Sequence, residues 1–417
     1  MKINFIASVL FAAFARSAMV YTGDTIDGYQ VASQIDVDAL PPCSNTRVWL
    51  QMPRSSIGQS WHVPVMIAKG EEGGKRLLMN SGIHGDGLNG IRVVQRVIND
   101  IDASKLKGVV IGIPGANVNG MLYGKHSFVS MAGSGFLTNL NQYFPGDVEE
   151  LDDVYQYVGI LWDRLISSNN VTHAVDFQTA AIGNTGSVYV EADKAIDYVN
   201  TMVSLSGADI ATYKTSDPDN GSLDEVLNSK NVSSIVYQLA NPRLFELDVI
   251  QRGYEYIFRL INDLGIYQNT VGDTDAYKAR KGATFQASAV QNHYANFGGL
   301  FELDVIQRGY EYIFRLINDL GIYQNTVGDT DAYKARKGAT FQASAVQNHY
   351  ANFGGFVETE VELNQDVKAG QILATMYDPH GDVIDTFKAK SNGRILAMNS
   401  DPLRDPGALV VAVAASS

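Results

Sequence analysis

An identical internal repeat constrains the fold of this chain more than any other feature of its sequence. Residues 244–299, which begin LFELDVIQRGYEYIFRL, recur without one change as residues 300–355, so that a 56-residue segment stands twice in tandem. Repeat architectures need at least three units, and their units diverge because each position needs only suitable packing. Two identical copies therefore indicate a recent duplication or an error in the gene model. A helix in the repeat has one natural place in a domain, so we expect its second copy to project with an exposed apolar face.

Outside the repeat, short apolar runs alternate with segments whose apolar residues recur at helical spacing. The expected strands are residues 63–68, 76–80, 108–113, 173–177 and 234–239, and the expected helices are residues 88–101, 154–165 and 247–264. Strands that alternate with helices build parallel sheets, because each crossover helix packs on a face of the sheet. The sequence therefore predicts an α/β fold with a mostly parallel mixed sheet that helices flank on both faces.

The sequence pattern changes at Phe356, where the pattern of short strands and turns replaces the helical pattern. Gly370, Gly381 and Gly393 punctuate this stretch at regular intervals, which is typical of a small all-β unit. The stretch resembles the barrel-sandwich domains of lipoyl and biotinyl carriers, but no lysine sits in an attachment hairpin, which argues against a carrier role. We therefore expect residues 19–299 to form the α/β domain, residues 300–355 to be the extra copy, and residues 356–417 to form a C-terminal β domain.

Residues 1–18 have the pattern of a secretory signal peptide. A lysine precedes an apolar run, and small residues follow the run. No later segment has the roughly 20 consecutive apolar residues of a membrane span. We therefore expect a secreted protein, in which Asn170, Asn220 and Asn231 stand in N-glycosylation acceptor patterns. Cys43 is the single cysteine, so no disulfide within the chain is possible, and we expect it to be buried and inert.

The charge balance excludes one class of partner. The formal net charge is -13, and no cluster of Lys and Arg provides the electrostatic footprint that nucleic acid requires. Hydrophobic residues make up 45% of the chain, which is enough to build the cores of two or three structural units. We therefore expect a small-molecule ligand, no nucleic acid and no membrane span, while the sequence predicts no oligomeric state.

Four stretches carry polar residues where strands turn into loops, which is where open α/β sheets bind ligands. They read SGIHGDGLNG, IPGANVNGMLYGKH with its continuation NLNQYFPG, VDFQTA, and SIVYQLA. In order and spacing they resemble the motifs of the succinylglutamate desuccinylase and aspartoacylase family, which are relatives of the zinc carboxypeptidases. The resemblance covers residues 61–264 and the C-terminal β domain. It implies a zinc carboxypeptidase-like fold and a family activity in which a zinc-bound water attacks the amide of an N-acyl amino acid.

The zinc ligands that the family pattern implies are mostly replaced. The pattern has a His, a Glu three residues later and a second His at a strand end; here these positions hold His84, Gly87 and Gln178. Catalytic zinc needs three protein ligands and one open position for its water. One imidazole does not retain zinc against water, so the sequence predicts that zinc is absent or weakly bound. Asp86 and His126 are two further groups that could join His84 around a metal.

Most of the catalytic and substrate-binding positions that the resemblance implies also differ from the family pattern, chiefly by holding neutral side chains. The family's catalytic Glu, a general base, corresponds to Gln238, whose amide cannot accept a proton from water at useful pH. The Asn and Arg that grip the substrate carboxylate correspond to Asn141 and Gln142, and an Arg that polarises the carbonyl corresponds to His126. Neutral side chains avoid the cost of burying charges whose partner dication has gone.

Three readings of the function follow from these replacements. In the first, the chain is a secreted and catalytically inactive relative whose pocket still binds an N-acyl amino acid, a peptide or another small ligand. In the second, it is an active zinc hydrolase of N-acyl amino acid amides with unorthodox ligands. In the third, the duplicated block marks an impaired gene product.

Overall fold

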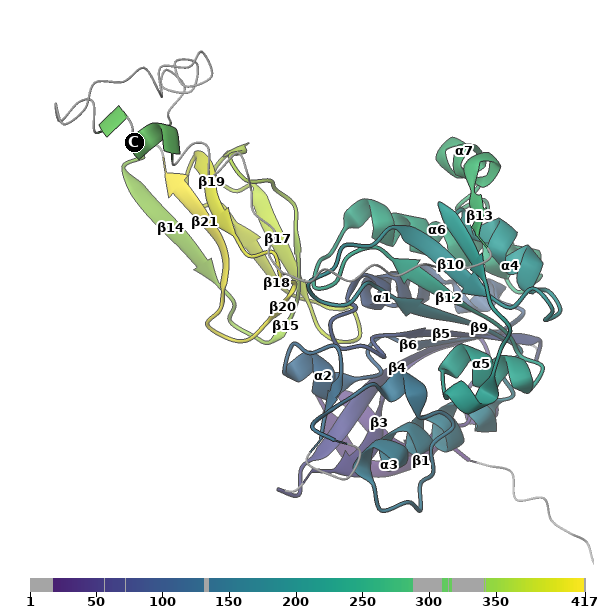
Figure 1. Cartoon of the computed structure of the whole chain (residues 1–417). Coiled ribbons are helices and arrows are strands. Elements are labelled where there is room, and N and C mark those ends of the chain that lie inside the picture. The colour runs from purple at the N-terminus through teal and green to yellow at the C-terminus, as the bar shows by residue number, and fades with distance from the viewer. Residues whose placement is uncertain are drawn as a thin grey trace, which may run out of the picture.

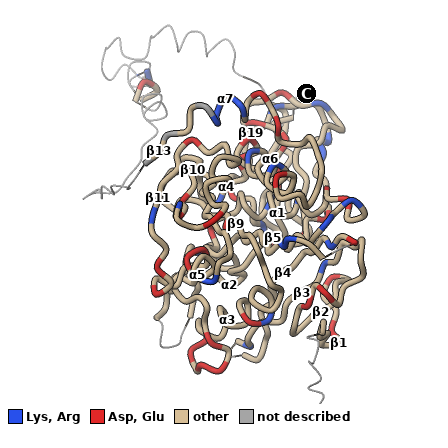
Figure 2. Tube along the Cα trace, turned by 90° about the vertical axis from the view of Figure 1, so that its right-hand side faces the viewer, with Lys and Arg blue, Asp and Glu red and all other residues tan. Residues whose placement is uncertain are grey.

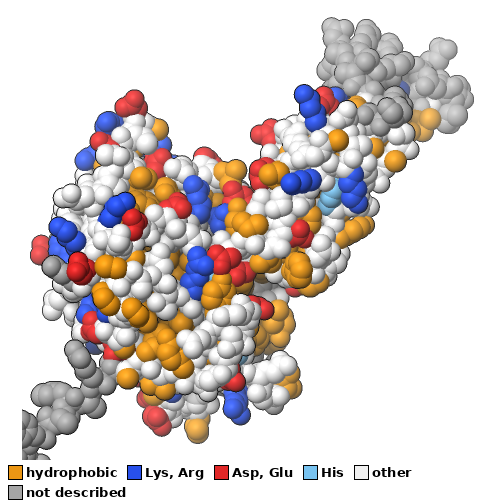
Figure 3. All heavy atoms as spheres, turned by 180° about the vertical axis from the view of Figure 1, so that it is seen from behind, with side chains coloured by type: hydrophobic (Ala, Val, Ile, Leu, Met, Phe, Trp, Pro, Cys, Tyr) orange, Lys and Arg blue, Asp and Glu red, His pale blue; other side chains and the backbone are white. Residues whose placement is uncertain are grey.

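The computed structural model describes residues 18–55, 57–71, 73–130, 135–287, 310–313, 315–316, 341 and 343–415. Residues 1–17 of the expected signal peptide and most of the second copy lie outside the described residues. The described chain forms an α/β body and a smaller β unit that projects from it (Figure 1), and the same two parts stand out in the space-filling view (Figure 3). No described helix is long and apolar enough to cross a membrane.

One eleven-stranded sheet forms the centre of the α/β body. Its strands, in spatial order, are β1 (Val20–Ile26), β2 (Tyr29–Gln34), β3 (Ser44–Arg54), β4 (Ser60–Lys69), β6 (Gly108–Ile113), β5 (Lys75–Ser81), β9 (His173–Gln178), β12 (Ser233–Leu239), β10 (Val188–Ala192), β11 (Ile210–Tyr213) and β13 (Phe285–Ala287). The strands β6, β5, β9 and β12 at its centre run parallel. Antiparallel pairs lie on both sides of this group, so the sheet is mixed. The expected strands of the body are all present.

Helices cover both faces of this sheet (Figure 1). The helices of the body are α1 (Asn89–Asp100), α2 (Val118–Leu122), α3 (Asp153–Leu161), α4 (Val199–Ser206), α5 (Leu223–Ser229), α6 (Leu247–Asp263) and α7 (Asp275–Ala283). Short helical turns are η1 (Val37–Ala39), η2 (Ala103–Lys105), η3 (Leu140–Gln142), η4 (Trp162–Ile166), η5 (Ser167–Asn169) and η6 (Pro218–Asn220). The expected helices correspond to α1, to α3 with η4, and to α6. Their apolar spacing predicted them because each of these helices packs one apolar face on the sheet.

Two apolar cores hold the helices to the sheet. One lies under α1, α4 and α6, and the other lies under α3 and α5 on the opposite face. The helices α1 and α6 pack closely at Gly253, where a Cβ atom would stand 2.8 Å from Cγ2 of Val93. A glycine at this position therefore allows the two helix backbones to approach each other.

The β unit consists of two four-stranded sheets around one apolar core. One sheet contains β14 (Ala345–Tyr350), β21 (Leu409–Ala415), β19 (Gly393–Met398) and β16 (Asp366–Val367). The other contains β18 (Val383–Lys388), β17 (Ile372–Tyr377), β15 (Gly355–Thr359) and β20 (Leu403–Arg404). A further small sheet in the body pairs β7 (Phe128–Val129) with β8 (Leu137–Thr138). Because β14 belongs to the second copy, the β unit includes residues before the expected boundary at Phe356.

Charged and aromatic contacts join the β unit to the body. Nε of Arg92 on α1 lies 2.8 Å from Oε2 of Glu358, and Nη1 of Arg47 lies 2.6 Å from Oδ2 of Asp382. The ring of His380 is fully buried between aromatic rings of β2 and β3 in the body. Between the two parts lies a cavity of about 550 Å³ whose lining includes Gly85, Met121 and many other apolar residues.

The surface of the body differs from expectation at one position. Cys43 is exposed and adopts a left-handed conformation at a turn, so the expectation that it is buried is wrong. The turn before β3 leaves the Cys43 side chain exposed, and the hydrophobic character of a thiol does not override that position. Acidic and basic residues are interspersed over the described chain (Figure 2).

Candidate functional site

The site lies where the central parallel strands end. Asn80 at the end of β5 is in register with Asp176 of β9, and Gln178 of β9 is in register with Gln238 of β12. Because parallel strands end at the same edge of a sheet, these side chains and the turn after β5 come together. The sequence motifs that were expected to meet do so at this edge.

His84 lies on the turn between β5 and α1 and is almost completely buried. Its Nε2 atom lies 2.9 Å from Oδ1 of Asn139, the residue that caps η3. The same Oδ1 accepts a hydrogen bond from the backbone N–H of Asn141, so it acts as an acceptor toward both groups. We infer that Nε2 of His84 carries the proton and that Nδ1 keeps a lone pair.

The Nδ1 atom of His84 is buried and has no hydrogen-bond partner among the described residues. Burial, together with the neighbouring His126, lowers the pKa of His84 to about 4, so the ring is neutral at physiological pH. An unpartnered lone pair in a buried position is unusual, because buried polar atoms are nearly always hydrogen bonded. His84 therefore presents a single nitrogen acceptor to the site.

His126 and Asp86 complete this side of the site. The rings of His84 and His126 stack with their centroids 3.8 Å apart. Nδ1 of His126 lies 2.9 Å from Oδ1 of Asp86, and Oδ2 of Asp86 accepts the backbone N–H of Ile182 at 2.8 Å. Burial acts to raise the pKa of Asp86, but the contacts with His126 and this N–H hold it below its usual value. Asp86 is thus a carboxylate whose two oxygens are both engaged.

The other side of the site is built from amides. Nε2 of Gln178 donates to Oδ2 of Asp176 at 2.7 Å, and Nε2 of Gln238 donates to Oε1 of Glu191 on β10 at 2.9 Å. Nε2 of Gln238 also lies 3.4 Å from Oε1 of Gln178. The two glutamines therefore belong to one hydrogen-bonded network that links three neighbouring strands.

Asp176 is the buried anchor of this network. It accepts hydrogen bonds from Gln178 and from Nδ2 of Asn80, the latter at 2.7 Å. Burial raises the pKa of Asp176 to about 7 in spite of these bonds, because the charged form is desolvated. Close by, Nζ of Lys214 lies 3.1 Å from Oδ2 of Asp224 and 2.6 Å from Oε1 of Glu225, which pairs the remaining buried charges.

Asn141 and Gln142, the positions expected to bind a carboxylate, differ in their surroundings. Oδ1 of Asn141 accepts the backbone N–H of Leu223, the first residue of α5, at 3.0 Å. Gln142 is the last residue of η3 and is exposed. The structure therefore uses the Asn141 amide to position α5, and a role of either residue in ligand binding stays a prediction.

The residues at the site do not fit a catalytic zinc. The described residues contain no group of three His, Cys, Asp or Glu side chains that could hold a metal ion. Of the expected ligand positions, only His84 offers a ring nitrogen with an unpartnered lone pair, and Asp86 is already committed to His126 and a backbone N–H. A Cβ atom at Gly87 would meet its nearest neighbour, the carbonyl oxygen of His84, at 3.4 Å. The turn therefore has room for a Cβ atom at this position, which the sequence does not supply.

Sequence reasoning missed two members of the site, Asn139 and Glu191. Asn139 stands in the NLNQYFPG stretch, and its place directly before a helical turn was the available signal, because Asn is a preferred cap. Glu191 lies on β10, a strand outside the expected set, and reaches the site through the antiparallel pairing of β10 with β12. No motif in the sequence marks it.

Residues 73–264 match the sequence profile of the succinylglutamate desuccinylase/aspartoacylase catalytic domain. This segment is similar to the catalytic domain of that family. The matched segment contains every strand end of the site described above. Its scaffold is therefore that of a family catalytic domain, and the replacements at Gly87, Gln178 and Gln238 are departures within it.

Individual members of the family show lower similarity. N-alpha-acetyl-L-2,4-diaminobutyric acid deacetylase from Halomonas elongata is 32% identical over 102 residues, which cover 24% of this chain and 28% of that protein. The product-bound ectoine utilization protein EutE from Ruegeria pomeroyi is 15% identical, with a TM-score of 0.49 and coverage of 90% and 98% of the two chains. A succinylglutamate desuccinylase/aspartoacylase from Rhodobacter sphaeroides is 12% identical, with a TM-score of 0.49 and coverage of 88% and 95%.

Proposed function

We propose that this chain is a secreted family member that keeps the scaffold and pocket of a zinc-dependent deacylase but neither holds zinc nor hydrolyses an amide. One observation carries the proposal: the positions of the second ligand and of the base hold Gln178 and Gln238, and both are committed to a closed hydrogen-bonded network. An amide is a poor zinc ligand and cannot take a proton from water. The site therefore lacks the two functions on which the family chemistry depends.

The ligand that we propose is a small molecule that contains an amide, such as an N-acyl amino acid or a peptide. The unpartnered lone pair on Nδ1 of His84 accepts an N–H donor, and such a bond would remove the cost of burying that atom alone. A cavity of about 550 Å³, the volume of a typical small-molecule site, reaches the turn at Gly85, although its lining does not include His84, Gln178 or Gln238. Binding without turnover is the expected outcome.

Metal content and activity test the proposal directly. Purified protein, with zinc added in excess and then dialysed, should contain far less than one zinc per chain by elemental analysis. It should release no free amino acid from N-acyl amino acids above the rate of buffer alone. Stoichiometric zinc together with amide hydrolysis that a chelator abolishes would refute the proposal.

A gain-of-function variant separates this proposal from its alternative, an active zinc hydrolase. We expect the triple substitution Gly87→Glu, Gln178→His and Gln238→Glu to raise zinc binding and hydrolysis by orders of magnitude, since the turn has room for a Cβ atom at Gly87. The matched control carries Gly87→Gln with the other two changes and should gain neither. If the native chain is already active and the triple variant gains nothing, the alternative is correct.

The alternative has one observation in its favour. The carboxylate of Glu191 lies 2.9 Å from the amide of Gln238, close to the position of the lost base. If Glu191 serves as the base of an active enzyme, Glu191→Gln abolishes native hydrolysis. Under our proposal the same substitution changes no activity, because there is none to lose.

Two further assignments belong to this proposal. We propose that the protein is secreted and glycosylated, and the three candidate asparagines, Asn170, Asn220 and Asn231, are exposed at turns, which supports this. For the β unit we propose a barrel-sandwich, which the two four-stranded sheets around one core support. Mass spectrometry of protein from a secreting host, before and after enzymatic removal of N-glycans, tests the first assignment. The absence of glycan and of the protein itself from the medium would refute it.

A further inference from the structure

The two identical segments of the chain have different surroundings. In the first copy, α6 fills a groove between α1 and α4, and its side chains Tyr256, Ile257 and Leu260 are completely buried. The groove is specific for this helix, because Gly253 permits the close approach to Val93 on α1. The first copy therefore contributes a large part of one core of the body.

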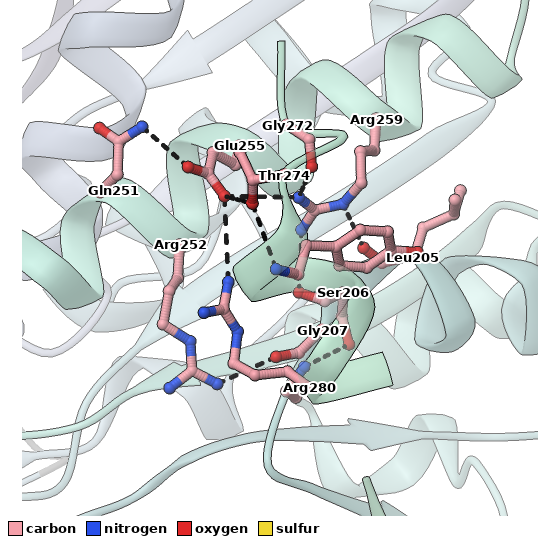
Figure 4. Close-up of polar contacts among 12 residues, drawn as sticks. Leu205, Ser206, Gly207, Gln251, Arg252, Glu255, Arg259, Gly272, Thr274 and Arg280 are labelled. Carbon is pink, nitrogen blue, oxygen red and sulfur yellow. Dashed lines mark hydrogen bonds and ion pairs between the residues drawn. The ribbon is translucent and has the colours of Figure 1, made fainter. Parts of the chain in front are cut away.

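Polar contacts also hold the same helix to α4 (Figure 4). Arg259 donates to the carbonyl oxygens of Leu205 and Ser206 in the last turn of α4, at 2.8 and 3.3 Å. Glu255 accepts from Gln251 on the same helix at 3.1 Å. Helix ends leave carbonyl groups without partners, so the guanidinium satisfies acceptors that burial would otherwise make costly. These contacts require the particular residues of this helix.

The second copy contains the same residues, but its described part is largely exposed. Tyr312, Ile313 and Leu316 are the counterparts of Tyr256, Ile257 and Leu260, and they are 57%, 48% and 39% exposed. They are helical, so the segment has already adopted the conformation that the groove accepts. The ion pair within the helix is present in both copies. Nη1 of Arg315 lies 3.6 Å from Oε2 of Glu311 in the second copy, and Nη1 of Arg259 lies 3.7 Å from Oε2 of Glu255 in the first.

We propose that residues 303–319, the counterpart of α6 in the second copy, dock as a helix in the groove of α6 in place of the first copy, within the same chain. The two helices have identical sequences, so each makes the same apolar and polar contacts in the groove. Either copy therefore completes the core of the body, and the other copy is spare. The groove is an interaction surface with two equivalent occupants.

The connections in the chain permit this exchange. Residues 320–344 lie between this segment and β14 in the sequence, and a chain of this length spans up to about 80 Å when extended. In either arrangement the spare copy adds the same 56 residues, to the connection after the docked helix in one case and before it in the other. The entropy of closing a loop depends only weakly on its length and not on which copy forms it. The exchange is independent of whether the protein binds zinc or hydrolyses an amide.

Matched charge substitutions in the two copies test the proposal. Ile257→Asp places a charge in the groove when the first copy is docked, and Ile313→Asp does the same when the second is docked. Each single variant should unfold within about 2 °C of the parent, because losing one of two equal occupants changes the folded-to-unfolded ratio only about twofold. The double variant should lose about 10 °C or more, or show no cooperative transition. Severe destabilisation by Ile257→Asp alone, with none by Ile313→Asp, overturns the proposal.

A disulfide test detects the second copy in the groove directly. In a Cys43→Ser background, Val93→Cys is combined with Gly253→Cys in one variant and with Gly309→Cys in the other, since residues 253 and 309 are equivalent. The first variant is the positive control for geometry. Exchange predicts that the second also forms a disulfide, and that it does so within the monomer. No disulfide in the second variant, or one only between two molecules, contradicts docking within the same chain.

Discussion

The two sides of the candidate site differ in how they carry charge. The His84 side keeps an imidazole with an unpartnered nitrogen, a second histidine and the ionised Asp86. The Gln178 side consists of neutral amides bonded to one another and to the buried carboxyl of Asp176. The His84 side therefore offers an unpartnered acceptor to a hydrogen-bond donor, whereas the amides of the Gln178 side already bond to one another and to Asp176.

This difference shows how a site is stabilised without a dication. A buried imidazole can lose its proton and become neutral, so His84 is tolerated without a metal. A carboxylate at the position of Gln178 or Gln238 would instead be a buried charge without a partner, which costs several kcal/mol. Amides avoid that cost and still fill the space. The four predictions below test each side in turn.

The largest expected effect comes from the anchor of the amide side. Asp176→Ala leaves the N–H groups of Asn80 and Gln178 buried without an acceptor, at 1 to 3 kcal/mol each, so we expect a loss of about 4 kcal/mol in the free energy of unfolding. Asp176→Asn, which keeps one acceptor, should lose about half as much. Urea titration of the three proteins measures this. Equal stability of the Ala variant and the parent would show that the amide network contributes nothing.

The pH dependence of stability should have opposite signs on the two sides. The pKa of His84 is about 4 in the folded state and near 6.5 when unfolded, so the folded state binds fewer protons between these values. Stability from His84 is therefore complete above pH 6.5 and is lost as the pH falls to 4, by about 3 kcal/mol. His84→Gln should remove this dependence.

Asp176 provides the contrasting case for the pH measurement. Its folded pKa is about 7, against an ordinary value of 3.8, so the folded state binds more protons in this range and stability falls as the pH rises through it. Stability should therefore increase more steeply with pH in Asp176→Asn than in the parent. In His84→Gln it should increase less steeply. Burial lowers the pKa values of His173 and His380 as it does that of His84, so they contribute to the pH dependence with the same sign. The quantity to compare is therefore the difference in stability between variant and parent at each pH. Parallel curves for all three proteins would contradict both assignments.

A smaller effect is expected at Asp86. Asp86→Ala removes the acceptor of His126 and of the backbone N–H of Ile182, and His126 is partly exposed, so water replaces one of the two bonds. We expect a loss of about 2 kcal/mol, with Asp86→Asn at about half of that. Thermal unfolding at pH 7 measures it. A neutral Ala substitution would mean that Asp86 does not fix the position of His126.

The smallest effect separates a structural from a ligand-binding role of Asn141. Asn141→Ala removes one hydrogen bond to the first N–H of α5, which is worth about 1 kcal/mol. The control, Gln142→Ala at an exposed side chain, should leave stability unchanged. If Asn141→Ala weakens binding of an N-acyl amino acid far more than it weakens the fold, the residue also contacts the ligand.

Local patterns were sufficient to predict the central strands, the three long helices and the turn that carries His84. Helical spacing of Ile91, Val94 and Val97 marks a buried face, and all three are buried in α1. The replacements at Gly87, Gln178 and Gln238 were also visible, since a motif is a local property. Asn139 and Glu191 were not, because their roles depend on contacts between residues far apart in the sequence.

The repeat separates what the sequence by itself determined from what only the tertiary structure decided. Both copies have the same helical periodicity, and residues 310–313 and 315–316 of the second copy are helical like their counterparts in α6, so local sequence determined the helix. Ile257 is nevertheless fully buried, while its counterpart Ile313 is 48% exposed. Burial requires a complementary surface, and the described body has one groove for two identical helices. The sequence therefore determined the helix and its apolar face, and the tertiary structure decided which copy covers that face.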